Sequence, residues 1–106
     1  MSYYIYIAED KDKGISKIGI ALCPRCRIVD FNNGLRHRFA CRGNLEVFHK
    51  IELHTQKEAR KIEKMALNVC KGKYKIYCGK ETFFATPQNL KGIVYSCIKE
   101  VENAVV

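Results

Sequence analysis

The chain has 106 residues, of which 47% are hydrophobic and 28% are charged. These values suit one folded domain over residues 1–106 and exclude a disordered chain. No apolar run approaches the ~20 residues that span a bilayer, so we expect a cytoplasmic protein without a membrane partner. Nineteen Lys and Arg oppose 11 Asp and Glu, and the net charge of +8 favours a polyanion such as nucleic acid as the partner.

Sequence patterns predict strands and helices along the whole chain. Tyr and Ile near the start predict a strand rather than a signal peptide. Pro24 suits the first turn of a helix, and Thr55 with Glu58 forms a capping box at the start of another. Gly34 and Gly72 are expected to end these two helices. In chain order, we expect a strand over 3–8, a polar turn over 9–16, a strand over 17–21, a helix over 24–33, a basic loop or short helix over 35–43, a strand over 45–53, a helix over 55–71, a strand or extended loop over 74–78, a short strand over 81–85 and a last helix from residue 86.

These elements predict a small α+β domain. The first two strands are joined by a turn that contains Gly14, so they most simply pair as an antiparallel hairpin. The apolar residues of the last helix keep helical spacing, so one of its faces is expected to pack on the sheet. The expected architecture is three or four mostly antiparallel strands with about three helices around them.

The six cysteines allow three interpretations. An even number in a short chain can form a disulfide framework. Cys70 and Cys97, however, fall in the apolar stripes of predicted helices, which favours buried free thiols. Cys23 and Cys26 have the spacing of half a zinc site, but a second half with such spacing is missing. Structural thiols are therefore the favoured interpretation and structural zinc the alternative, in which Cys41 and Cys78 would supply the remaining ligands.

One carboxylate occupies an unexpected position on the helix predicted over 55–71. When residues are spaced about 100° apart around its axis, Glu63 falls inside the apolar arc, between the directions of Leu67 and Cys70. A core-facing carboxylate is costly unless it is paired, hydrogen-bonded or bound to metal. The alternative is that Glu63 lies at the edge of the stripe and reaches solvent.

Several segments of this sequence resemble the motifs of the GIY-YIG endonuclease superfamily. Its first motif is a strand ending in Tyr, then a hairpin and a strand with Tyr-Ile-Gly, and here Tyr4-Ile5-Tyr6 and Lys17-Ile18-Gly19 correspond to it. An Arg on the following helix corresponds to Arg27, and a later Ala-x-x-hydrophobic-Glu pattern to Ala59-Arg60-Lys61-Ile62-Glu63. The branch with Lys-Ile-Gly, found in phage and repressor-like proteins, also has a Glu-x-Phe near its end, here Glu81-Thr82-Phe83. The resemblance spans about residues 3–85.

This resemblance implies hydrolysis of DNA phosphodiester bonds with Mg²⁺ or Mn²⁺ held by Glu63. Magnesium suits such a sparse oxygen site because it keeps several waters and takes ligands from phosphate. Arg27 would pair with phosphate oxygens, and Tyr6, which hairpin spacing favours over Tyr4, would activate or orient the attacking water. Lys17, at the position of the second motif's Tyr, would act as a base if burial or Arg27 lowers its pKa, and otherwise as a phosphate contact.

Each of these residues also has a structural interpretation. Tyr6 could be a core tyrosine, Lys17 a solvated lysine at a strand edge and Arg27 a surface charge on its helix. His37 is the candidate for an accessory proton carrier, with a solvated histidine as the alternative. The residues expected to contact the DNA backbone are Arg25, Arg36, Arg38 and Arg42.

Two other functions compete with the nuclease. One is a catalytically degenerate protein of the same fold, of a phage or bacterium, that binds DNA or regulates without cutting. The other is a protein-interaction or zinc-stabilised module that uses Cys23 and Cys26. A chain this short would cover little duplex, so double-strand cutting would favour a homodimer or a partner subunit.

Overall fold

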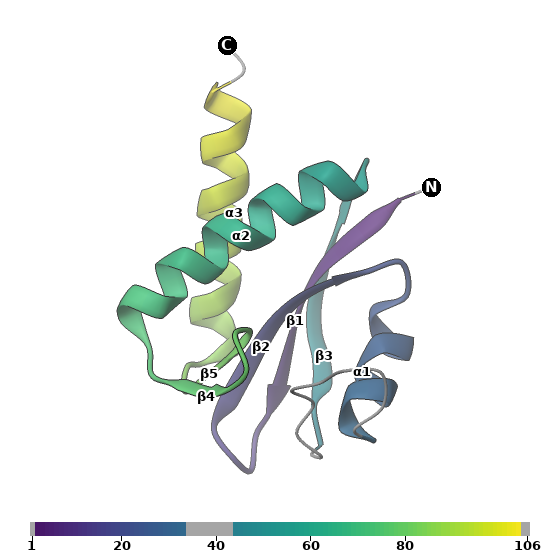
Figure 1. Cartoon of the computed structure of the whole chain (residues 1–106), viewed down its shortest axis with the longest axis vertical. Helices are drawn as coiled ribbons and strands as arrows, with labels where there is room; N and C mark the ends of the chain where they lie inside the picture. The colour runs from purple at the N-terminus through teal and green to yellow at the C-terminus, as the bar shows by residue number, and fades with distance from the viewer. Residues whose placement is uncertain (1, 34–43, 105–106) are drawn as a thin grey trace.

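The computed structural model describes residues 2–33 and 44–104, and within these an α+β fold of three helices and a five-stranded antiparallel sheet (Figure 1). The sheet order is β3-β1-β2-β5-β4. The elements in chain order are β1 (Tyr3–Asp10), β2 (Ile15–Ala21), α1 (Pro24–Asn32), β3 (Glu46–Leu53), α2 (Gln56–Lys73), β4 (Ile76–Cys78), β5 (Thr82–Phe83) and α3 (Pro87–Ala104). No helix in the described ranges is long and apolar enough to cross a bilayer.

The predicted fold class is confirmed, but the expected three or four strands are five. The segments expected over 74–78 and 81–85 both form short strands, and β4 pairs with β5 across a turn that contains Gly79. Gly79 has a φ of 62°, a conformation that favours glycine. β5 also pairs with β2 through Lys17 and Thr82, so the late hairpin extends the sheet formed by the first three strands.

The β1–β2 hairpin is longer than predicted because a buried carboxylate organises its turn. Asp10, 2% exposed, accepts backbone N–H bonds from Asp12 and Lys13 at 3.1 and 3.2 Å. Its second carboxylate oxygen accepts a bond from the backbone of Asn44, just before β3. Gly14, with a φ of 65°, completes the turn. The strands therefore extend to Asp10 and Ile15 rather than ending near residues 8 and 17.

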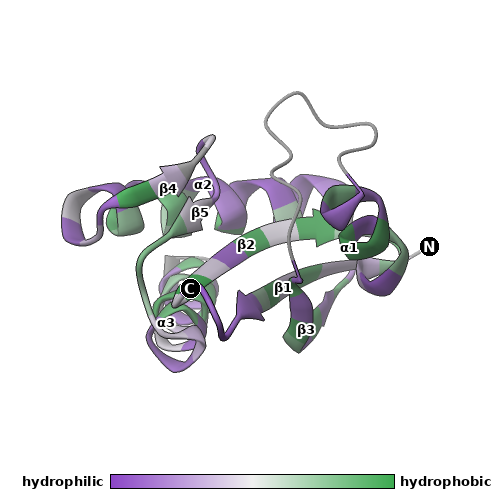
Figure 2. Ribbon diagram, turned by 90° about the horizontal axis from the view of Figure 1, so that it is seen from below, coloured by the Kyte–Doolittle hydropathy of each residue, from purple (hydrophilic) through white to green (hydrophobic). Residues whose placement is uncertain are grey.

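The alternation of β1 divides the core into two clusters. Ile5 and Ile7 join the larger cluster with apolar residues of α2 and α3, while Tyr6 and Ala8 join a smaller one with Ile28 and Phe31 of α1. Figure 1 shows α2 crossing α3, and Figure 2 shows α1 at the opposite end of the sheet from α3. Tyr6 thus belongs to the α1 side of the sheet.

A proline and a pair of hydrogen bonds stabilise the two ends of α1, and a capping hydroxyl stabilises the start of α2. Pro24 occupies the first turn of α1, as predicted. At the other end of α1 the Asn32 amide donates to the Leu45 carbonyl and accepts from the Leu45 N–H, both at 2.9 Å. The Thr55 hydroxyl caps α2 by accepting the N–H of Glu58 at 3.1 Å, as the capping-box pattern predicts.

The prediction that Gly72 ends this helix is wrong. α2 continues to Lys73, and the cap residue Tyr74 donates its N–H to the Cys70 carbonyl at 2.8 Å. A glycine inside a helix costs only about 1 kcal/mol relative to alanine. The burial of Ala66 and Cys70 on one face of α2 supports the last turn despite that cost.

Candidate active site

Four elements contribute four of the five predicted catalytic residues. Tyr6 lies on β1, Lys17 on β2, Arg27 on α1 and Glu63 on α2. Charges on Arg27 and Glu63 both act on the Tyr6 hydroxyl, and charges on Lys17 and Arg27 both act on the Glu63 carboxylate. The fold therefore brings the four side chains into one electrostatic cluster.

Tyr6 lies against Gly19, its direct partner across the β1–β2 ladder. A Cβ atom built on Gly19 would lie 2.5 Å from Cζ of Tyr6 and closer still to its hydroxyl oxygen, so only glycine leaves room for the ring. The ring is 1% exposed and packs with the cluster under α1. The Ile-Gly pair of the sequence motif thus has a steric reason: Gly19 makes the space that Tyr6 fills.

Lys17 is a buried cation with a defined partner. It is 2% exposed and forms an ion pair with Glu81, whose side chain is 28% exposed. Its ammonium nitrogen also lies 4.9 Å from the ring centroid of Phe31 and 6.0 Å from that of Tyr6, within cation–π range. The alternative of a solvated strand-edge lysine is therefore wrong. The ion pair engages Lys17 as a cation, which favours a phosphate contact over a base.

Glu63 is half-buried, and its environment disfavours the charged carboxylate. Burial and repulsion from Glu81 raise the pKa of Glu63 from 4.5 to about 7, against the opposing attraction of Lys17, Arg60 and Arg27. Helical periodicity predicted this unfavourable environment, since it placed the Glu63 carboxylate among apolar residues. A cation beside Glu63 would relieve it.

The Tyr6 hydroxyl keeps its proton at neutral pH. Burial is the largest cause of a raised pKa for Tyr6, and the negative charges of Glu81 and Glu63 add to it, while Arg27 opposes them. Of the two roles expected for Tyr6, the environment thus favours orienting a water over removing its proton. A protonated phenol both donates and accepts a hydrogen bond.

Glu81 belongs to the cluster, although the sequence indicated it only as part of a Glu-x-Phe motif. Its backbone carbonyl accepts the N–H of Ile18 at 3.1 Å, next to Lys17 on β2, and its carboxylate pairs with Lys17. This position depends on the two-residue pairing of β5 with β2. Arg60, one turn before Glu63 on α2, is a second residue that the sequence did not single out.

The residues fit a sparse site for a hard divalent cation. Among the described residues no group of three or more His, Cys, Asp or Glu side chains could hold a metal ion. Glu63 and Glu81, however, are close enough for each charge to act on the other, and Mg²⁺ is bound through one or two carboxylates plus waters and phosphate oxygens. Such an ion would offset the burial and the repulsion from Glu81 that raise the pKa of Glu63.

Of the residues predicted to contact the DNA backbone, the structure describes only Arg25. Arg25 lies exposed in the first turn of α1. Arg36, His37, Arg38 and Arg42 lie outside the described residues, so their predicted roles stay predictions.

A hollow of about 500 Å³ beside α1 is lined by Arg27 and Arg60 among others. Another, of about 880 Å³ between α1 and β3, has none of Tyr6, Lys17, Arg27 and Glu63 among its described lining residues.

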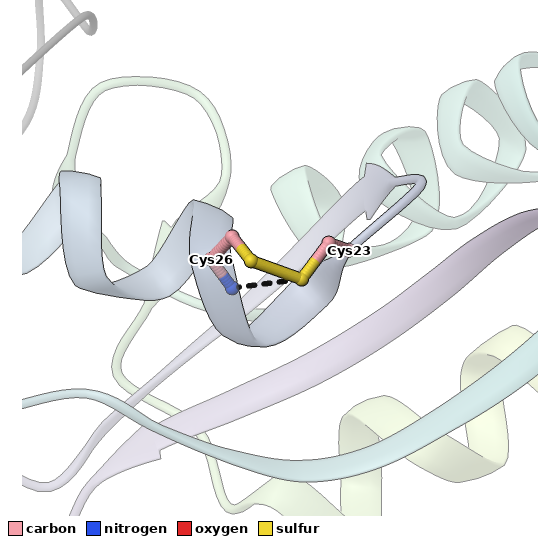
Figure 3. Close-up of a disulfide and its surroundings, with 2 residues drawn as sticks. All are labelled: Cys23 and Cys26. Atoms are coloured by element: carbon pink, nitrogen blue, oxygen red, sulfur yellow. Dashed lines mark hydrogen bonds between the residues drawn. A yellow bond between two sulfur atoms is a disulfide. The ribbon is translucent and has the colours of Figure 1, made fainter.

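The structure corrects the interpretation of Cys23 and Cys26. They form a disulfide at the start of α1 rather than a pair of free thiols or half of a zinc site (Figure 3). Their Cα atoms are 5.4 Å apart, a separation that the first helical turn provides and a disulfide needs. Cys70 and Cys97 are buried free thiols, as predicted.

Comparisons of the chain with models of known protein families, with curated proteins and with solved structures found no match. The GIY-YIG resemblance therefore rests on the residues and their spacing.

Proposed function

We propose that the chain is a metal-dependent endonuclease of the GIY-YIG type that hydrolyses DNA phosphodiester bonds. The observation that supports it is the convergence of Tyr6, Lys17, Arg27 and Glu63 from four separate elements on one cluster of mutually acting charges. Perturbed carboxylates beside cationic side chains gather at catalytic sites more often than elsewhere. The net charge of +8 suits the same polyanionic substrate.

In this proposal each residue has a role that its surroundings favour. The Arg27 guanidinium pairs with phosphate oxygens, and the buried Lys17 of β2 adds a second positive charge. The Tyr6 hydroxyl orients the water whose oxygen bonds to phosphorus as the bond to the leaving oxygen breaks. Glu63, with Glu81 beside it, holds a divalent cation. Such a cation would supply charge neutralisation and an activated water.

The Lys17–Glu81 ion pair favours one alternative, a DNA-binding protein of the same fold that does not cut. In that protein Glu81 and Lys17 would neutralise each other permanently, and Glu63 would keep its proton in a large share of molecules near neutral pH because its pKa is about 7. The basic residues of α1 would then hold DNA without hydrolysis. The two functions differ in whether a cation competes for Glu63 and Glu81.

The deciding experiment incubates supercoiled plasmid with the protein at low salt, with and without Mg²⁺ or Mn²⁺. Two variants are compared, Glu63→Gln and the matched control Glu102→Gln, which makes the same change at an exposed position near the end of α3. Metal-dependent nicking that Glu63→Gln loses and Glu102→Gln keeps is the expected result. Equal DNA binding by all three proteins without nicking would support the non-cutting alternative instead. Absence of both binding and nicking would contradict both.

A further inference from the structure

The first turn of α1 contains a feature that the proposed nuclease does not use, the Cys23–Cys26 disulfide. Cys23 is the N-terminal cap of α1 and Cys26 lies three residues further on (Figure 3). Both cysteines are exposed. A sulfur–sulfur bond that solvent reaches can be attacked by a dissolved thiol, whereas a buried one cannot.

The cross-link contributes little to holding the fold together. It joins residues only three positions apart, and the loop that a disulfide closes determines how far it restricts the unfolded chain. Asn32 and Leu45 already anchor the other end of α1, and Ile28 and Phe31 bury its inner face. A purely structural role therefore leaves this disulfide largely unexplained.

The remaining described thiols provide a contrast. Cys70 is fully buried, and burial, together with Cys97, raises its pKa to about 11. Burial also raises the pKa of Cys97, with Glu100 adding to it. Thiols protected in this way stay protonated and unreactive. Compared with Cys70 and Cys97, the sulfur atoms at the start of α1 are therefore the accessible ones.

The surroundings of the disulfide favour a thiolate leaving group. The N–H of Cys26 donates to the sulfur of Cys23 at 3.3 Å, and this bond would persist to a thiolate at the helix N-terminus (Figure 3). The first turn of α1, described throughout, contains no acidic residue but does contain Arg25. Helix N-termini and neighbouring cations are the features that activate cysteines in proteins.

A recess suited to an anion lies beside the sulfur atoms. Cys23 and Cys26 both line the hollow of about 500 Å³, and its other described lining residues include Arg27, Arg60 and the carboxylate of Asp30. The Arg60 guanidinium donates to the Gln56 side-chain oxygen at 2.8 Å in the amide orientation that satisfies both groups. A small thiol that carries carboxylates could place its sulfur at the disulfide and a carboxylate near the guanidinium groups.

We propose that Cys23–Cys26 is a thiol–disulfide exchange site for a low-molecular-weight thiol that carries carboxylates. The incoming thiolate attacks one sulfur, forms a mixed disulfide with it and releases the other cysteine as a thiolate. A second thiol attacks the mixed disulfide and releases the small-molecule disulfide. The protein disulfide gains two electrons and two protons, and two small thiols lose them. This chemistry requires no nuclease activity.

The sequence itself provides a readout of the exchange. Trypsin cleaves after Arg25, between the two cysteines, so the flanking peptides stay linked only while the disulfide is closed. The folded protein is equilibrated in glutathione buffers of graded redox ratio, alkylated, and digested under non-reducing conditions. We expect the linked peptides to give way to separate alkylated peptides as the ratio becomes more reducing, and to return on reoxidation, with circular dichroism unchanged.

Two comparisons test the site and its preference. In Cys26→Ser, the remaining Cys23 should form a mixed disulfide with oxidised glutathione about threefold faster than Cys26 does in Cys23→Ser, since a larger thiolate fraction is partly offset by lower nucleophilicity. Oxidised glutathione should also react with Cys23 at least about threefold faster than cationic cystamine at low ionic strength. Arg60→Gln should reduce that second preference, while the neighbouring exposed control Lys61→Gln should not.

Three results would overturn the proposal. The linked peptides could persist at every redox ratio until the protein is unfolded by urea. One zinc per chain could be found on purified protein, with both cysteines protected from alkylation until chelation. Glutathione and cystamine could react at equal rates, with or without Arg60, which would refute recognition of the carboxylates.

Discussion

At the scale of single residues, Glu63 couples the candidate site to the stability of the fold. Its pKa is 4.5 when exposed and about 7 in the folded protein, chiefly because of burial. Between these pH values the folded protein retains a proton that the unfolded chain has released. The free energy of unfolding therefore falls as pH rises through this window, and the full cost is present above it.

This linkage makes Glu63→Gln a stabilising change at high pH. Without metal, the variant should exceed the wild type by about 1–2 kcal/mol at pH 8, allowing for solvent screening at a half-buried position, and the difference should vanish below pH 4.5. Urea unfolding in EDTA at several pH values measures it. A difference independent of pH would mean that Glu63 titrates normally in the folded state. Glu102→Gln, at an exposed position, should show no such pH dependence.

Gly19 and Tyr6 form a second residue-level pair whose coupling can be measured. Gly19→Ala places a methyl group against the hydroxyl end of the Tyr6 ring, and the overpacking should cost about 1–3 kcal/mol. In a Tyr6→Ala background the same methyl group meets no ring, so its cost should largely disappear. Urea unfolding of the four proteins in this double-mutant cycle gives the coupling free energy. Additive effects would show that the Gly19 constraint comes from the backbone rather than from Tyr6.

The sequence predicted part of this cluster, and the reason lies in how each residue is positioned. Tyr6 and Lys17 lie on strands joined by a short turn, so local spacing sets where they meet. Glu63 stood out because helical periodicity alone places it among apolar residues. Glu81 could not be found in this way, since only the non-local pairing of β5 with β2 brings it to Lys17.

At the scale of elements, the boundaries that the sequence missed are those decided by tertiary contacts. The hairpin strands extend because Asp10 satisfies the turn, and α2 passes Gly72 because its apolar face stays packed. Capping by Thr55 and the Pro24 start were predicted correctly because each depends on a few neighbouring residues. Long-range packing outweighs a local stop signal of about 1 kcal/mol.

The helical glycines provide an element-level prediction. A Cβ atom on Gly72 of α2 or on Gly92 of α3 would meet nothing within 4 Å. Gly72→Ala and Gly92→Ala should each stabilise the protein by about 0.5–1 kcal/mol, because alanine loses less backbone entropy on folding. Gly14→Ala is the matched control. It also has open space, but its φ of 65° disfavours a side chain, so it should destabilise. Thermal unfolding of the three variants measures these changes, and destabilisation by Gly72→Ala would show that the last turn of α2 is not helical in solution.

At the scale of the whole molecule, the core consists of a larger cluster and of a smaller cluster that contains Tyr6. One cluster fills the space between the sheet and the α2–α3 pair, while α1 covers Tyr6 and Ala8 in the other. Glu63 belongs to α2, yet its carboxylate interacts electrostatically with Lys17 and Arg27, so the candidate site draws on both parts of the fold. A variant that loosens either part should therefore disturb the site as well as the stability.

The proposed DNA partner makes a prediction that separates local contact from overall charge. If the α1 side of the molecule holds the phosphate backbone, the logarithm of the binding constant should fall linearly with the logarithm of salt concentration, by about 0.9 for each phosphate contacted. Arg25→Gln should lower the magnitude of that slope by roughly one contact, or about 0.9.

Lys99→Gln removes the same charge from an exposed position in α3, whose last turns lie far from α1 in Figure 1. It should leave the slope unchanged, because released counterions are those displaced at the contact itself. Fluorescence anisotropy of a labelled duplex over a salt series measures both variants. Equal effects of the two substitutions would mean that net charge alone attracts DNA and that α1 has no special part in holding it. An effect confined to Arg25 would place the duplex on the side of the sheet where Tyr6, Lys17 and Arg27 lie.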